Sequence, residues 1–174
     1  MNSLDPLTKA PDLTLPLVGG GEWSLAAQTP ESFTMIVVYR GYHCPVCKGY
    51  LGKLNSLMDL AAENGLGVVA VSMDGAERAA AAKEEWGLDR LDVAYGMSED
   101  KAREWGLYIS SSIKEAESDI FAEPGLFWIT AEGTIYLVDV ANMPFARPDL
   151  ELLIPKASFA NANGYPARGT KTAG

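Results

Sequence analysis

The chain has two cysteines, Cys44 and Cys47, which lie three positions apart in the segment 42–47 (YHCPVC). Two cysteines placed at random in a chain of this length would have that spacing only about one time in ninety, so the spacing needs an explanation. Three kinds of site use such a pair: a redox dithiol, half of a metal site, and two buried thiols that only fill space. The elements around the pair help to choose between them.

Four apolar runs predict strands that are buried on both faces of a sheet. The last two runs are separated by a short segment that contains Gly133, which is typical of a hairpin. The four predicted strands cover residues 35–39, 66–71, 126–129 and 135–138.

A helical pattern fills residues 45–64, between the first two predicted strands. Leu51, Leu54 and Met58 recur at intervals of three and four, and Gly65 stands where a helix commonly ends. A strand, a helix and a strand in this order predict two parallel strands joined by a right-handed crossover.

The remaining chain extends the same α/β pattern. Segment 6–21 is expected to form an edge hairpin or arm, and segment 161–174, rich in Gly, Ala and Pro, a surface tail. We therefore expect a single α/β domain over residues 1–174. Further helices are predicted at 76–86, 98–105 and 149–159.

Cys44 follows the first predicted strand and precedes the first predicted helix, with Pro45 at a plausible first helical position. A helix N-terminus carries unpaired N–H groups and a partial positive charge, which stabilise a thiolate. The apolar stripe extends back from Leu51 by four residues to Cys47, so Cys47 is expected to face the core and Cys44 to lie at the exposed helix tip. One accessible and one shielded thiol is the arrangement of a dithiol exchanger, in which the outer sulfur attacks and the inner sulfur resolves.

Charge and composition exclude several classes of partner. The chain carries 23 acidic against 14 basic side chains, a formal net charge of -9. That sign argues against nucleic acid or an anionic membrane as a partner. The single histidine, His43, excludes a site that needs two imidazoles. No apolar run is long enough to cross a bilayer and no signal peptide is recognised, so the expected location is cytoplasmic.

Segment 39–47 (YRGYHCPVC) resembles the active-site loop of the thioredoxin-like superfamily. It is most similar to the peroxiredoxin-like branch, the alkyl hydroperoxide reductase/thiol-specific antioxidant (AhpC/TSA) family. Segment 10–16 (APDLTLP) matches that family's opening segment, and segment 125–135 is similar to two of its core strands. This resemblance, over about residues 10–153, implies a thioredoxin fold: a central mixed sheet flanked by helices, with an N-terminal extension.

The resemblance also implies an activity. It implies a thiol-dependent oxidoreductase that accepts electrons from a dithiol donor and reduces a disulfide or a hydroperoxide. No cofactor is implied beyond the redox-active Cys44–Cys47 disulfide, and a homodimer is compatible with the family.

The chain departs from the peroxiredoxin pattern in the loop itself. Peroxiredoxins carry a Pro-x-x-x-Thr-x-x-Cys loop, and its alignment on Cys47 places Arg40 at the Pro and Cys44 at the Thr. The family's peroxide-site arginine falls on Pro124, where thioredoxins carry a cis-proline that faces the cysteine pair. Arg147 matches a second family arginine. We therefore expect a disulfide exchanger, with a cis bond before Pro124.

The sequence thus predicts an oxidoreductase that cycles a Cys44–Cys47 dithiol and disulfide. A true hydroperoxide reductase is the alternative, and a copper or zinc carrier that uses the same pair is a further one. Ordinary roles stay open: a surface ion pair for Arg40, a solvated loop position for His43, and a trans turn for Pro124. We expect no metal, and the residues expected to bind substrate or tune the thiolate are Arg40, His43, Pro45, Pro124 and Arg147.

Overall fold

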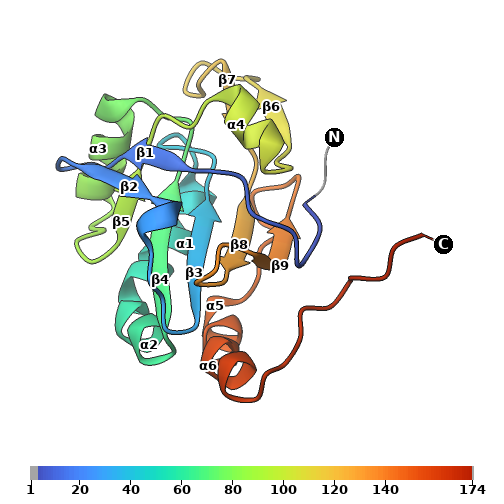
Figure 1. Cartoon of the computed structure of the whole chain (residues 1–174). Helices are drawn as coiled ribbons and strands as arrows, with labels where there is room; N and C mark the ends of the chain where they lie inside the picture. Colours follow the sequence, from blue (N-terminus) through green and yellow to red (C-terminus); the bar gives the residue numbers. More distant parts are fainter. Residues whose placement is uncertain (1–3, 174) are drawn as a thin grey trace.

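The computed structural model describes residues 4–173 and is built around a five-stranded mixed sheet in the order β5-β4-β3-β8-β9 (Figure 1). Strand β3 pairs in parallel with β4, and β4 with β5, whereas β8 runs antiparallel to both β3 and β9. The four predicted strands are confirmed, and the short β5 was not predicted. The strands are β3 (Phe33–Val38), β4 (Leu66–Val71), β5 (Asp92–Ala94), β8 (Gly125–Ile129) and β9 (Ile135–Val140).

Helices cover both faces of this sheet (Figure 1). The helix predicted at 45–64 is divided at Leu57, whose backbone leaves the helical region with φ −102° and ψ 10°. The helix predicted at 149–159 is divided at Pro155, which has no N–H to continue the hydrogen-bond ladder. The helices are α1 (Pro45–Ser56), α2 (Met58–Glu63), α3 (Ala76–Glu85), α4 (Glu99–Glu104), α5 (Leu150–Leu153) and α6 (Pro155–Ala162).

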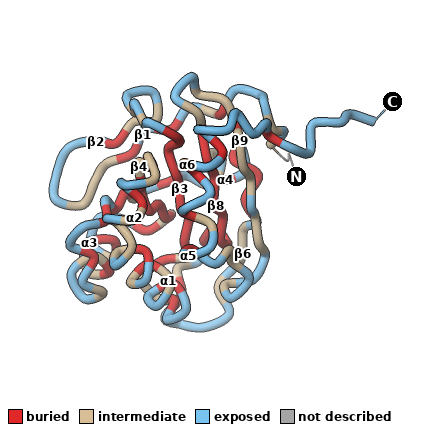
Figure 2. Tube along the Cα trace, turned by 90° about the horizontal axis from the view of Figure 1, so that it is seen from below, coloured by how far each residue is buried: buried red, intermediate tan, exposed pale blue. Residues whose placement is uncertain are grey.

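Two apolar cores lie on the two faces of β3 and its neighbours. Met35 and Val37 pack into the core beneath α1 with Leu51, whereas Ile36 and Val38 pack into the core on the opposite face. This alternation follows from the two-residue period of a strand and explains why the whole of β3 is apolar. Figure 2 shows the buried residues gathered along the central strands, with exposed chain around them.

Two antiparallel hairpins flank the sheet. The first joins β1 (Thr14–Pro16) to β2 (Glu22–Ser24) and is followed by a short 3₁₀ turn at Leu25–Ala27. A hairpin therefore forms near the N-terminus as expected, but its second strand lies beyond the expected segment 6–21. The second joins β6 (Ile109–Ser111) to β7 (Ile120–Ala122) and was not predicted. In the part of the chain that the structure describes, no helix combines the length and apolar character needed to span a membrane.

Candidate active site

The cysteine pair lies where the chain passes from β3 into α1. Cys44 is the N-cap residue of α1, with φ −100° and ψ 105°, and Pro45 occupies the first turn as expected. The Cys44 sulfur accepts a hydrogen bond from the backbone N–H of Cys47 at 3.2 Å. It thereby satisfies one of the N–H groups that a helix start leaves unpaired.

Both thiols are free and buried, with 1% of Cys44 and 0% of Cys47 exposed. The expectation that Cys44 lies at an exposed helix tip is therefore wrong. Its sulfur turns inward to cap the helix, and the exposed part of the loop consists of Pro45 and Val46 instead. A large substrate can reach this sulfur only if neighbouring side chains move aside.

The two thiols have opposite acidities. The pKa of Cys44 falls from its ordinary 9.0 to about 6, chiefly because the Cys47 thiol donates a hydrogen bond to it. The Cys47 N–H, Arg40 and the charge of Arg147 lower it further, against the effect of burial. Burial, the Cys44 hydrogen bond and the negative charge of Cys44 together raise the pKa of Cys47. The reduced pair therefore holds a thiolate at Cys44 and a neutral thiol at Cys47.

The low pKa of Cys44 matters more when Cys44 is the leaving group than when it is the attacking nucleophile. At about pH 7, lowering a pKa from 9 to 6 raises the thiolate fraction roughly ninetyfold. Intrinsic nucleophilicity falls with a Brønsted slope of about 0.45, which removes roughly twentyfold over the same three units. The attack rate gains only about fourfold. The larger benefit arises when a second thiol attacks the other sulfur of a mixed disulfide on Cys44, because the Cys44 thiolate is then a good leaving group.

The pH dependence of alkylation tests this assignment. Because the pKa of Cys44 lies below its ordinary value, the labelling rate of the reduced protein with iodoacetamide should rise through about pH 6 and level off by about pH 7. Peptide mass spectrometry should place the adduct on Cys44. Replacement of Cys47 by Ala removes the S–H donor and should move the rise to higher pH. A rise confined to alkaline pH, or an adduct on Cys47, would contradict the assignment.

Arg147 reaches the pair from the loop after β9. Its Nη2 donates a hydrogen bond to the Cys47 sulfur at 2.8 Å, and its guanidinium lies 4.8 Å above the centre of the Tyr50 ring. Tyr50 is itself fixed by a 2.8 Å hydrogen bond to the Pro148 carbonyl. The Nε and Nη1 atoms of Arg147 are buried without a partner. The structure thus brings this expected site residue to Cys47 and leaves two of its donor atoms free.

Arg40 lies on the Cys44 side of the site and pairs with buried acids. Its Nε lies 3.1 Å from Oε1 and 3.0 Å from Oε2 of Glu123, and its Nη2 is 4.0 Å from Glu117. Glu123 and Glu117 are 3% and 7% exposed, so the ordinary alternative of a surface ion pair does not describe Arg40. Sequence reasoning missed both glutamates because nothing in their spacing points to Arg40.

His43 packs inside the loop rather than in solvent. Its ring lies 4.6 Å from the ring of Phe121, and both ring nitrogens are buried without a hydrogen-bond partner. Burial, and secondly the charge of Arg40, lower the pKa of His43 to about 4. His43 is therefore neutral at pH 7 and adds no positive charge next to Cys44.

Pro124 is buried but does not match the thioredoxin pattern. No cis peptide bond occurs in residues 4–173, so the expected cis bond before Pro124 is wrong. Strand β7 ends at Ala122 and β8 begins at Gly125, so the chain continues almost directly from one strand into the next and a trans bond suits it. Pro124 borders a very small cavity together with Tyr50 and Arg147.

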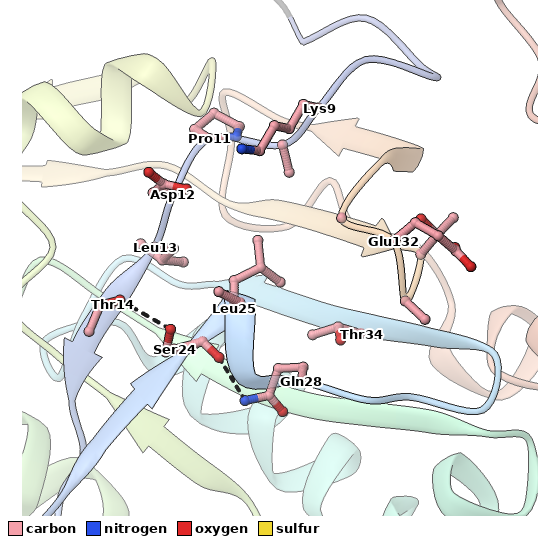
Figure 3. Close-up of a pocket in the computed structure, with 15 residues that line it drawn as sticks. Lys9, Pro11, Asp12, Leu13, Thr14, Ser24, Leu25, Gln28, Thr34 and Glu132 are labelled. Atoms are coloured by element: carbon pink, nitrogen blue, oxygen red, sulfur yellow. Dashed lines mark hydrogen bonds between the residues drawn. The ribbon is translucent and has the colours of Figure 1, made fainter.

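A pocket away from the cysteines is shown in Figure 3. It has a volume of about 510 Å³ and lies between the N-terminal segment, the turn after β2 and the loop between β8 and β9. Thr34 borders it at the start of β3, whereas the cysteines follow the end of that strand. Among the described residues, no group of three or more His, Cys, Asp or Glu side chains is arranged to hold a metal ion.

Comparison with known proteins agrees with this architecture. The sequence model described as the AhpC/TSA family matches residues 6–138. The peroxidoxin BcpB of Mycobacterium tuberculosis superposes with a TM-score of 0.71 at 15% identity, covering 93% of this chain and 98% of that one. A peroxiredoxin-like protein of Aquifex aeolicus gives 0.74 at 19% identity, covering 91% and 89%.

A third solved structure, described as a putative thiol:disulfide interchange protein DsbE of Chlorobium tepidum, gives a TM-score of 0.66 at 24% identity, covering 89% of this chain and 99% of that one. No curated protein matches the sequence. The structural likenesses show the fold, and they confirm the expected thioredoxin fold with its mixed sheet between helices.

Proposed function

We propose a specific reaction for this chain, which belongs to the AhpC/TSA family of thiol-dependent oxidoreductases. Cys44 and Cys47 cycle between a dithiol and a disulfide and thereby reduce disulfide substrates. One observation carries this proposal. The Cys44 sulfur caps α1, accepts the Cys47 N–H at 3.2 Å and has its pKa lowered to about 6, while the neighbouring Cys47 thiol stays protonated. An attacking thiolate is thus one helical turn from a thiol that can resolve it.

In the first step the Cys44 thiolate attacks one sulfur of the substrate disulfide. The substrate S–S bond breaks, a mixed disulfide forms on Cys44, and the first substrate thiol leaves with a proton from solvent. Cys47 then loses its proton and attacks the Cys44 sulfur, which expels the second substrate thiol and forms the Cys44–Cys47 disulfide. A dithiol donor reduces this disulfide by the same exchange and is itself oxidised. Arg147 stabilises the Cys47 thiolate through its 2.8 Å hydrogen bond.

Hydroperoxide reduction is the second candidate, and two observations favour it. Both sulfurs are buried, and a small molecule reaches a buried sulfur more readily than a protein does. Arg147 also has two unpaired donor atoms beside Cys47. Cys47 would lose its proton and attack one peroxide oxygen, so that an S–O bond forms as the O–O bond breaks, giving a sulfenic acid on Cys47 and an alcohol or water. Cys44 would then condense with that sulfenic acid, forming the same disulfide and releasing water.

Parallel assays separate the two candidates. Turnover of a small peptide disulfide and of hydrogen peroxide should be measured on one preparation with one dithiol donor. We expect the disulfide to be reduced faster, and Arg147→Gln to lower peroxide turnover about tenfold, which corresponds to about 1.4 kcal/mol. The same variant should lower disulfide turnover less, because Cys44 performs the attack. Faster turnover of peroxide than of disulfide would favour the second candidate instead.

A further inference from the structure

The Arg40 guanidinium is held from two directions. Along its edge, Nε donates to Oε1 of Glu123 at 3.1 Å and lies 3.0 Å from Oε2. Across its face, the guanidinium carbon lies 4.7 Å from the centre of the Phe121 ring, within the range of a cation–π contact. A carboxylate at the edge and a ring on the face together fix both the position and the plane of this side chain.

Glu123 is itself held in place. Its side chain is 4% exposed, and the Ser110 hydroxyl donates to the same Oε1 at 3.0 Å. Its backbone N–H donates to the Tyr108 carbonyl at 2.8 Å. Ser110 lies in β6 and Glu123 follows β7, so the hairpin that sequence reasoning missed supplies the support for Arg40.

The same support lies beside the loop that carries the reactive sulfur. The backbone N–H of Cys44 donates to the Gly41 carbonyl at 3.1 Å, which folds the loop back so that Cys44 lies next to the Arg40 segment. His43, the residue before Cys44, packs on the same Phe121 ring that supports Arg40. The Arg40 guanidinium and the His43 ring thus lie on one aromatic ring, and Arg40 helps to lower the pKa of Cys44.

We infer that Glu123 is a positioning residue: with Ser110 behind it and Phe121 beside it, its carboxylate holds the Arg40 guanidinium next to the loop that carries Cys44. Glu123 does not touch the reacting atoms and acts only through Arg40. The inference rests on the proposed function, because it assigns Glu123 to the step in which Cys44 carries the negative charge.

The direction in which the Cys44 pKa changes when Glu123 is removed distinguishes the positioning role from a direct electrostatic effect of the Glu123 charge. A nearby negative charge opposes the Cys44 thiolate, so removing the Glu123 charge by itself can only lower the pKa of Cys44. Loss of the support has the opposite effect, because a released Arg40 no longer stabilises the thiolate. A rise in the pKa after Glu123 is truncated therefore indicates lost positioning. The other charged or titratable groups near Cys44 are Cys47, Arg147, His43 and Glu117.

The experiment is a titration of the reduced full-length protein, following the ultraviolet absorbance of the thiolate against pH. We expect Glu123→Ala to raise the Cys44 pKa by about 1 unit, within the usual effect of one adjacent opposite charge. Glu123→Gln should restore a low value, because its amide oxygen can still accept from Arg40 Nε. In the Arg40→Ala background, Glu123→Ala should produce no rise. Glu115→Ala is the matched control, since it removes one exposed acid from the loop between β6 and β7.

A fall or no change in Glu123→Ala would overturn the inference, as would a rise that persists without Arg40. If Glu123→Ala does not fold, Ser110→Ala removes only the hydroxyl behind the carboxylate and should give a smaller rise in the same direction, and no rise would overturn the inference. The titration of the wild-type protein distinguishes failure of the proposed function from failure of the inference about Glu123. A Cys44 pKa near the ordinary thiol value overturns the proposed function along with the inference, whereas a low value that Glu123→Ala leaves unchanged overturns the inference alone.

Discussion

Replacement of Cys44 by Ser should lower the turnover of a model disulfide by on the order of 10³-fold or more, because a hydroxyl cannot supply the thiolate that attacks. Replacement of Cys47 by Ser should also stop turnover, but only after the first step. In that variant the substrate half should stay attached to Cys44 as a mixed disulfide. Steady-state rates with a dithiol donor, together with the intact mass of the protein after mixing with substrate, measure both effects.

The location of the trapped adduct decides the order of the two cysteines. Because the pKa of Cys44 is lowered and that of Cys47 is raised, the adduct is expected on Cys44 in the Cys47→Ser variant. The double variant Cys44→Ser/Cys47→Ser is the control and should give no adduct. A stable adduct on Cys47 in the Cys44→Ser variant, formed at the wild-type rate, would show that the roles are reversed.

Replacement of Gly41 by Ala should unfold the active-site loop or destabilise the whole chain. Gly41 has φ +137°, a backbone conformation that residues with a side chain rarely adopt. A Cβ atom at this position would lie 2.7 Å from Oδ1 of Asp74. Asp74 is 4% exposed and accepts the Tyr42 N–H at 2.8 Å, so its carboxylate has little room to move. Backbone strain and loss of that hydrogen bond together should lower the free energy of unfolding by about 3 kcal/mol.

Urea unfolding and the alkylation rate of Cys44 measure this effect on stability and on the site. We expect the alkylation rate to change as well, since Gly41 accepts the Cys44 N–H and fixes the loop in which the sulfur lies. Gly49→Ala is the matched control, because Gly49 lies in α1 with nothing within 4 Å of an added Cβ. That change should stabilise the chain by roughly 0.5–1 kcal/mol. Equal stabilities of the two variants would contradict this account of the loop.

The framework of the fold could be predicted from the sequence because its signals are local. The apolar runs that became β3, β4, β8 and β9 are continuous, and a run of this kind shows its two-sided burial directly. The missed strands β5, β6 and β7 have three residues each, too few to show a period. Where the sequence misled, at residues 45–64, an apolar pattern continued across a break in backbone geometry at Leu57.

The site was predictable in its identity and less so in its geometry. Spacing identified Cys44 and Cys47, and the family resemblance identified Arg147, which contacts Cys47. The inward turn of the Cys44 sulfur depends on a single side-chain rotation, which no pattern of residue types reports. Glu123 contacts Arg40 across 83 positions of sequence, and long-range pairs of this kind leave no local trace.

A redox titration is the direct test of whether Cys44 and Cys47 cycle between a dithiol and a disulfide. The reduced protein should be equilibrated in mixtures of a dithiol and its disulfide, quenched with an alkylating reagent, and analysed by mass spectrometry. We expect one two-electron transition in which both thiols become inaccessible to the reagent together, with a peptide that links Cys44 to Cys47. Thiols that stay free at every potential, or a disulfide that joins two copies of the chain instead, would contradict it.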